Sequence, residues 1–294
     1  MAMNIKQFIA DPQNFKSLKD FKTDKVTGVS GKEESADRLE KYKKNMEILQ
    51  DRLYADDRYS LLIIFQAMDA AGKDSTIKHV MTGLNPQGCQ VYNFKKPSTE
   101  ELNHDFLWRT YRCFPERGKI GIFNRSYYEE VLIAKVHPEI ILQQRIPGIQ
   151  SIKKINEKFW MKRYESINNM EKHLVENGTV ILKFFLHVSK QEQTTRFLKR
   201  VNEPDKNWKF ALNDIIESKN WENYQDAYGR MIKETSTDIA PWYIIPADKK
   251  WFMQIAVAEI MLERLEELNL KYPVLSDAQT ADIDKGRKIL NLEK

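Results

Sequence analysis

Cysteine is scarce in this sequence. Only two occur among 294 residues, Cys89 and Cys113, and neither stands in a Cys-x-x-Cys pair or beside a histidine cluster. This scarcity argues against a zinc site and predicts a reducing compartment. Long apolar runs are missing as well: the longest, Leu61 to Phe65, is far too short to cross a bilayer, and residues 1–16 contain no apolar core of signal-peptide length. We therefore expect a cytoplasmic protein that does not associate with membranes.

The sequence also lacks a large excess of charge of one sign. Its 47 basic and 42 acidic residues leave a formal net charge of +5, which argues against a general nucleic-acid-binding protein. There is no internal repeat and no low-complexity linker. With 41% hydrophobic residues the chain can form a sizeable core. We expect an N-terminal arm at 1–31, where periodicity is weak, followed by a single domain at 32–294.

Residues 60–78 are the stretch around which the chain is organised. The run Leu61 to Phe65 has no polar alternation, which is typical of a strand covered on both faces. Small residues then allow consecutive backbone amides to turn toward one point, and a helix opening at Gly72 adds unpaired N–H groups. This pattern predicts a phosphate-binding loop. Its expected phosphate-binding residues are Ala70, Ala71, Gly72, Lys73, Asp74 and Ser75.

The loop departs from the pattern G-x-x-x-x-G-K-[ST] at two positions. Ala67 replaces the first glycine, and Asp74 replaces the Ser or Thr that usually binds magnesium. Lys73 is retained and is expected to reach the outer phosphates. Asp69 offers a carboxylate to Mg²⁺, a cation that prefers oxygen ligands. An ordinary strand-to-helix turn remains the alternative at this stage.

Further apolar segments alternate with amphipathic ones along the rest of the chain. The alternation predicts an α/β fold with a five-stranded parallel sheet flanked by helices. Besides 60–66, the expected strands are 89–94, 119–123, 179–187 and 241–245. The longer expected helices are 32–54, 98–111, 148–176, 251–268 and 276–290.

Polar residues follow the strand at 119–123. The carboxyl ends of parallel strands meet at one edge of a sheet, so Arg125 and Glu129 are expected to face the same crevice as the phosphate loop. Taken singly, an Arg and a Glu at this spacing are also typical of a surface ion pair.

Two groups of basic residues have helical spacing. Arg196 and Arg200 fall on one face of a helix that opens at Ser189 and repel each other unless an anion lies between them. They predict a lid, at about 189–220, that clamps a phosphoryl group; two exposed charges are the alternative. Lys154, Lys158 and Lys162 recur every four residues and indicate either a solvated stripe or, together with Arg109, a track for a polyanion.

Several blocks in the right order resemble the family 2 polyphosphate kinases, over residues 15–270 or so. These blocks are Gln66 to Lys73, Phe123 to Glu129, Val136 to Glu139, the Arg196/Arg200 helix, Asn207 to Phe210 and Ala240 to Trp242.

The resemblance implies a P-loop kinase of the thymidylate-kinase-like type with a helical lid and Mg²⁺. Such enzymes move a terminal phosphoryl group between inorganic polyphosphate and a nucleotide, and tend to form homo-oligomers, here a dimer or tetramer. The residues placed by analogy are Asp69 and Lys73 in the Walker A block, Arg125 and Glu129 in the Walker B region, and Arg196 and Arg200 in the lid. Metal binding then falls to Asp69 and Glu129.

Asn124 departs from the subgroup that has Asp at this position. The subgroup with Asn accepts nucleoside monophosphates as well as diphosphates, so the resemblance implies AMP and ADP as acceptors. Guanine nucleotides are expected as further partners. Two rival functions remain open from the sequence. One is an ATP-dependent nucleotide kinase on the same fold, and the other is a non-catalytic protein that binds nucleotide or polyanion.

Overall fold

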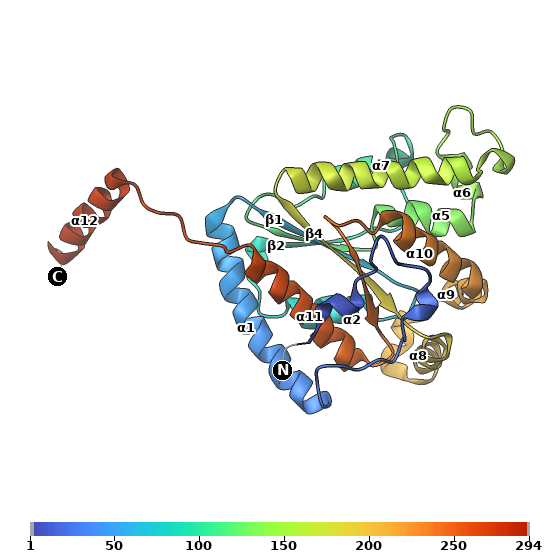
Figure 1. Ribbon diagram of the computed structural model, residues 1–294, viewed down its shortest axis with the longest axis horizontal. Helices are drawn as coiled ribbons and strands as arrows, with labels where there is room; N and C mark the ends of the chain where they lie inside the picture. Colours follow the sequence, from blue (N-terminus) through green and yellow to red (C-terminus); the bar gives the residue numbers. More distant parts are fainter. Residues whose placement is uncertain (1–2, 293–294) are drawn as a thin grey trace.

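A five-stranded, all-parallel sheet forms the centre of the protein. The computed structural model describes residues 3–292 (Figure 1). The strand order is β2-β3-β1-β4-β5, and every neighbouring pair is parallel. The strands are β1 (Ser60–Gln66), β2 (Cys89–Asn93), β3 (Ile120–Asn124), β4 (Thr179–His187) and β5 (Trp242–Pro246). All seven residues of the central strand β1 are buried, and the predicted fold class is confirmed.

Helices cover both faces of the sheet, as the unalternated apolar strands require. Figure 1 shows α7 and α10 on one side of the strands and α1, α2 and α11 on the other. The bounds of these helices are α1 (Lys32–Asp56), α2 (Lys73–Met81), α7 (Glu157–Glu176), α10 (Trp221–Thr235) and α11 (Lys250–Glu267). Helix α11 is buried along most of its length because it packs between α1 and the sheet.

Shorter elements connect these layers. The remaining α-helices are α3 (Thr99–Leu102), α4 (Trp108–Tyr111), α5 (Ile133–Val136), α6 (Glu139–Gln143), α8 (Lys190–Asn202), α9 (Leu212–Glu217) and α12 (Asp277–Leu292). The 3₁₀ turns are η1 (Ile5–Phe8), η2 (Leu18–Asp20), η3 (Pro86–Gly88), η4 (Tyr127–Val131), η5 (Ile152–Lys154), η6 (Pro204–Lys209) and η7 (Ser218–Asn220).

Two predicted helices have different bounds in the structure. The helix expected at 98–111 is divided into α3 and α4, because the Asp105 carboxylate accepts a hydrogen bond from the Leu107 amide and turns the chain. The helix expected from residue 148 begins at Glu157, where the Asn156 side chain caps it. Lys154 therefore lies in η5, outside α7, and the expected stripe of three lysines on one helix face was wrong.

The N-terminal segment packs on the edge of the sheet. The Phe8 side chain is buried, and Ile9 forms an antiparallel bridge with Tyr243 of β5. The Met3 amide donates to Oε1 of Glu259 in α11 at 2.6 Å. Residues 1–2 of the predicted arm and 293–294 of the predicted domain lie outside the described residues.

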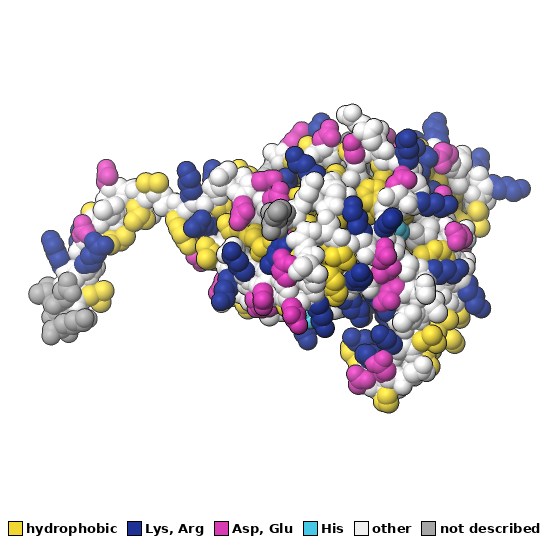
Figure 2. Space-filling view, turned by 60° about the horizontal axis from the view of Figure 1, so that its bottom comes forward, with side chains coloured by type: hydrophobic (Ala, Val, Ile, Leu, Met, Phe, Trp, Pro, Cys, Tyr) yellow, Lys and Arg dark blue, Asp and Glu magenta, His cyan; other side chains and the backbone are white. Residues whose placement is uncertain are grey.

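The surface agrees with the small net charge. Figure 2 shows basic and acidic side chains interspersed over the visible face. Between residues 3 and 292, no helix combines the length and the apolar character that a membrane span needs. At the C-terminus, α12 projects away from the body at the end of an extended segment (Figure 1).

Candidate active site

The loop between β1 and α2 curls around a small space at the carboxyl edge of the sheet. Ala70 and Gly72 have left-handed backbone conformations, with φ of 60° and 109°, and the Ala71 amide donates to the Met68 carbonyl at 3.2 Å. A side chain on Gly72 would be strained by its φ and would approach the Met253 side chain at 3.1 Å. The sharp turn points the N-terminus of α2 at the cavity, as a phosphate loop requires.

The Lys73 ammonium lies inside this loop. Its Nζ donates to the carbonyl of Ala67 at 2.8 Å and to that of Met68 at 3.4 Å. Exclusion from water lowers the pKa of Lys73, and the nearby Arg125 guanidinium lowers it further, whereas Asp69 and Glu129 oppose the shift. The ammonium is thus held where an anion in the loop would meet it.

Arg125 connects the loop to the end of β3. It has a left-handed φ of 62°, and its amide donates to the Phe65 carbonyl of β1. Its Nη2 lies 2.8 Å from Oδ1 of Asp69, and its Nη1 lies 3.9 Å from Oε2 of Glu129. Burial raises the pKa of Glu129, and the Arg125 and Lys73 charges counteract this. The structure therefore brings four predicted residues together: Asp69, Lys73, Arg125 and Glu129.

The two positions that depart from the P-loop pattern contact each other. Asn124 Nδ2 donates to Oδ1 of Asp74 at 2.6 Å. In ordinary P-loop enzymes Mg²⁺ is held by a Ser or Thr at the position of Asp74 and by an Asp at the position of Asn124. In this protein the carboxylate belongs to Asp74 in the loop, and the neutral Asn124 amide orients it.

Two cavities meet at Asp69, Arg125 and Asp214. The larger one, of about 710 Å³, contains the phosphate loop, with Asp69, Asp74 and Asp214 as its acidic residues. Its basic residues number ten: Lys73, Lys95, Lys96, Arg125, Arg196, Lys199, Arg200, Lys206, Lys209 and Lys250. The smaller one, of about 150 Å³, is lined by apolar and aromatic as well as polar groups. Its remaining lining residues include Glu129, Leu132, Ile133, Asn213, Glu217, Tyr224 and Tyr228.

The two predicted lid arginines have separate partners. Arg196 is only 5% exposed, and its Nε donates to Glu192 at 2.8 Å. Arg200 Nη1 lies 3.0 Å from Oδ2 of Asp214. The expectation that the pair needs a shared anion was wrong, because each guanidinium already has a carboxylate within reach.

The residues of the expected polyanion track lie elsewhere. Lys154, Lys158 and Lys162 line neither cavity. Arg109 is nearer: its Nη2 donates to the Lys95 carbonyl at 2.8 Å, and Lys95 lines the larger cavity. Arg109 therefore supports the wall of that cavity through the backbone.

Sequence reasoning missed several basic residues of the larger cavity. Lys95 and Lys96 directly follow a predicted strand, so the rule that ligands gather at strand ends identifies them. Lys199, Lys206 and Lys209 lie within the predicted lid but were not singled out there, and Lys250 carries no local signal because it reaches the cavity through the placement of α11.

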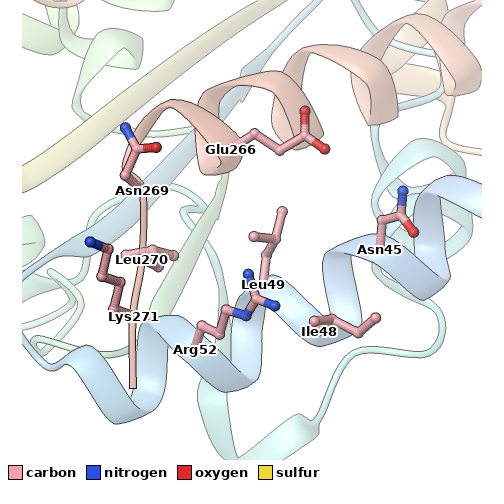
Figure 3. Close-up of a pocket in the computed structure, with 8 residues that line it drawn as sticks. All are labelled: Asn45, Ile48, Leu49, Arg52, Glu266, Asn269, Leu270 and Lys271. Atoms are coloured by element: carbon pink, nitrogen blue, oxygen red, sulfur yellow. The ribbon is translucent and has the colours of Figure 1, made fainter. Parts of the chain in front are cut away.

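A third cavity lies away from the loop, between α1 and the end of α11 (Figure 3). Its volume is about 460 Å³, and its charged residues are Arg52, Glu266 and Lys271. It lacks the concentration of positive charge that surrounds the phosphate loop.

Known proteins resemble this chain over most of its length. The sequence profile described as polyphosphate kinase 2 matches residues 29–273. A protein of Rhodopseudomonas palustris named ADP-polyphosphate phosphotransferase is 52% identical over 242 residues, which are 82% of this chain and 83% of the relative. A protein of Meiothermus ruber named AMP/ADP-polyphosphate phosphotransferase is 40% identical over 270 residues, covering 92% of this chain and 96% of the relative.

A solved structure is similar as well. The crystal structure of polyphosphate kinase 2 from Arthrobacter aurescens TC1 has a TM-score of 0.85 and 36% sequence identity, covering 96% of this chain and 94% of that chain. These similarities confirm the resemblance predicted from the sequence blocks. Together they establish that the chain belongs to the polyphosphate kinase 2 family.

Proposed function

We propose that this protein transfers a terminal phosphoryl group, reversibly, between inorganic polyphosphate and ADP or AMP. The observation that carries the proposal is the larger cavity, whose lining includes a phosphate loop, ten basic residues and only three acidic ones. Inorganic polyphosphate, which carries many charges but no base or sugar, suits such a surface. Its binding is favoured because each phosphate that is neutralised releases counterions. The names of the relatives from Rhodopseudomonas palustris and Meiothermus ruber agree with these substrates.

The two cavities suggest where each substrate lies. Polyphosphate occupies the larger, basic cavity, with its terminal phosphate in the loop at Gly72 and Lys73. The nucleotide enters the smaller cavity, where Tyr224 and Tyr228 offer aromatic surface. The acceptor phosphate then meets the donor at Asp69 and Arg125, which belong to both cavities. Phosphoryl transfer requires this in-line alignment.

The site acts by positioning and by neutralising charge. Lys73, Arg125 and Arg200 place positive charge around the transferring group, and loop amides at the start of α2 bind its oxygens. A transition-state donor of this kind contributes on the order of 3 to 4 kcal/mol. A phosphate acceptor is already ionised near neutral pH, so the reaction needs no strong general base.

The donor set fits Mg²⁺ bound together with phosphate oxygens. No group of three or more metal-binding side chains occurs in the described part of the chain, and Mg²⁺ in kinases is held by one or two carboxylates and the substrate phosphates. Asp69 and Glu129 are the predicted ligands, and Asp74, which lines the larger cavity, is a further candidate. Bound Mg²⁺ neutralises phosphate charge.

Asn124 is the residue on which the choice of acceptor rests. Aspartate at this position would place a second carboxylate against Asp74, and two adjacent carboxylates resist joint ionisation. The resemblance links asparagine at this position to both acceptors, and on that ground we propose a site that accepts AMP as well as ADP, as the name of the Meiothermus ruber relative states for that protein. The Rhodopseudomonas palustris relative is named for ADP alone, and guanine nucleotides remain proposed acceptors here.

The test is ATP formation by the purified protein with Mg²⁺ and long-chain polyphosphate as the only phosphoryl donor. ADP and AMP are supplied in separate reactions, and ATP replaces polyphosphate in a parallel series. Turnover with both acceptors supports the proposal, and turnover with ADP alone overturns the AMP assignment. Turnover with ATP but not polyphosphate would identify an ATP-dependent nucleotide kinase, whereas a folded sample inactive with every donor would indicate a non-catalytic binder.

The proposal also includes a cytoplasmic location and a homo-oligomeric state. Both cysteines, Cys89 and Cys113, are free thiols, which agrees with a reducing compartment. The oligomer, a dimer or tetramer, is tested by the experiment on α12 below.

A further inference from the structure

We propose that Arg196, together with Gln193, is a positioning residue that holds the phosphate loop from behind, rather than a lid residue that grips phosphate. This inference concerns the site of the proposed function and names the part of α8 that keeps it in shape. It rests on hydrogen bonds that connect α8 to the loop and to the segment after β5.

The Arg196 guanidinium has five N–H donors, and all five find acceptors within the protein. Nε donates to Glu192 at 2.8 Å. Nη1 donates to the carbonyls of Ala71 at 2.5 Å and Ala70 at 3.1 Å. Nη2 donates to the carbonyls of Ala247 at 2.6 Å and Asp248 at 3.2 Å. No N–H of Arg196 is left for a phosphate oxygen, and a phosphate contact would break an existing bond.

Three successive loop carbonyls are held by α8. Gln193 Nε2 donates to the Asp69 carbonyl at 2.9 Å, next to the bonds that Arg196 makes with Ala70 and Ala71. Gln193 is buried like Arg196, and both extend from the first two turns of α8. The outer side of the loop is therefore fixed by two neighbouring side chains.

Fixing the carbonyls also fixes the amides of the same peptide groups. All peptide bonds of the described residues are trans, so each N–H points opposite to the C=O of its own peptide group. The bond from Arg196 to the Ala71 carbonyl thus turns the Gly72 N–H away from α8, toward the side of the loop where Lys73 and the larger cavity lie. Arg196 sets the direction of a phosphate-binding amide without touching phosphate.

The same contacts divide α8 into two parts with different roles. Arg196 in its second turn also lines the larger cavity, but its guanidinium is bound to the loop and to Ala247, whereas Lys199 and Arg200 in the last turn line the cavity without contacts to the loop. A lid movement that kept the loop intact must therefore bend the chain after Arg196. The fixed part of the lid, up to Arg196, and the part that moves therefore both belong to α8.

The test compares Arg196→Lys, Arg196→Ala and Arg200→Ala. Lysine keeps the charge, but its donors share a single nitrogen and cannot reach acceptors on both sides of the guanidinium. We expect Arg196→Lys and Arg196→Ala both to lower kcat about 100-fold, since small displacements of catalytic groups have effects of this size. Free guanidinium at non-denaturing concentration should restore part of the kcat of Arg196→Ala, and an equal concentration of ammonium should not.

Hydrogen exchange provides a readout that does not depend on turnover. In Arg196→Ala the amide of Ala71, which donates to the Met68 carbonyl within the loop, should exchange at least about tenfold faster than in the wild type, as expected for locally opened backbone. In Arg200→Ala this amide should keep wild-type exchange, while the KM for polyphosphate rises. Gln193→Leu gives the same exchange test if Arg196→Ala does not fold.

Wild-type exchange of the Ala71 amide in Arg196→Ala, or near-normal turnover of Arg196→Lys, would overturn the inference and return Arg196 to the phosphate-binding residues. If the wild-type protein fails to use polyphosphate, the proposed function fails, but the exchange result still decides the role of Arg196.

Discussion

At the scale of single residues, the Lys73 ammonium lies beside the loop in the larger cavity. Lys73 is bound by loop carbonyls, and its pKa is lowered because its charge is poorly solvated and lies near Arg125. A phosphate bound in the loop, as proposed, would supply a compensating negative charge and stabilise the charged form of Lys73. Phosphate binding and the charge on Lys73 therefore reinforce each other.

We predict that Lys73→Ala abolishes most turnover while leaving the fold intact. The expected loss in kcat is about 100- to 1000-fold, the effect of removing one transition-state donor. Asp69→Ala is expected to behave similarly. Lys78→Ala, on the exposed side of the same helix, is the matched control and should retain wild-type turnover. Circular dichroism checks the fold, and wild-type rates in both Lys73→Ala and Asp69→Ala would contradict the mechanism.

His187 provides a prediction about pH and stability. It lies at the end of β4, is 7% exposed, and its Nδ1 has no hydrogen-bond partner within residues 3–292. Burial lowers the pKa of His187 to about 4, against an ordinary value of 6.5. Between these two values the unfolded chain binds more protons than the folded protein, so the free energy of unfolding must rise with pH.

The contribution of His187 is fully present above pH 6.5 and decreases as the pH falls toward 4. Between pH 7 and pH 5 we expect it to remove about 2 kcal/mol of stability. Urea unfolding at these two pH values should show a smaller difference for His187→Gln than for the wild type. His173→Gln, on the exposed side of α7, should not change the difference. Equal pH dependence in all three proteins would show that His187 is not the titrating group.

At the scale of elements, the sequence correctly predicted structures that depend on interactions between residues close together in the chain. The strand, loop and helix from Ser60 to Met81 follow from an apolar run, small residues and the spacing of Gly72 and Lys73 after the strand, all within one short stretch. The start of α7 was misplaced because the Asn156 cap competes with several equally polar residues upstream. The hydrogen-bond partners of Arg196 could not be predicted, because they are backbone carbonyls about 125 and 51 residues away, which no spacing pattern reveals.

The proposed lid, at about 189–220, gives a spectroscopic prediction. Trp208 in η6 is 79% exposed, lines the larger cavity, and has the Lys209 ammonium 4.8 Å from its ring centre. Closure of the lid over a polyanion would take this indole out of water. We therefore expect tripolyphosphate to shift tryptophan emission to shorter wavelength.

The shift should vanish in Trp208→Phe and persist in Trp108→Phe. Trp108 is the control because it stacks on His104 and lines neither cavity at the loop. A shift that survives in Trp208→Phe would mean that another tryptophan reports the binding, and an unchanged spectrum in the wild type with tripolyphosphate bound would mean that η6 does not close.

At the scale of the whole molecule, contacts between distant segments set the limits of prediction. The N-terminal segment has little periodicity, yet Phe8 packs near Phe252 with ring centres 6.2 Å apart. Its partners, β5 and α11, lie more than 230 residues further along the chain. The pattern of the segment alone indicates only an arm, whereas the structure shows side chains that complete the core.

The last prediction concerns α12, which projects from the body at the end of an extended segment (Figure 1). Its 16 residues include Gly286, and an isolated helix of this length is marginal in water. Ile283, Ile289 and Leu290 are exposed on it. These observations favour a second copy of the chain as the surface that covers α12, in keeping with the proposed dimer or tetramer.

We expect light scattering of the full chain to give a multiple of 34.7 kDa, and truncation after Leu275 to give a smaller assembly with an intact circular dichroism spectrum for the body. Ile289→Asn combined with Leu290→Asn should reproduce the truncation, because it removes apolar area from the contact without shortening the chain. Lys285→Ala, a change of one exposed charge on the same helix, should leave the mass unchanged. A full chain that is monomeric, or an assembly whose mass survives the truncation, would show that α12 does not join two copies.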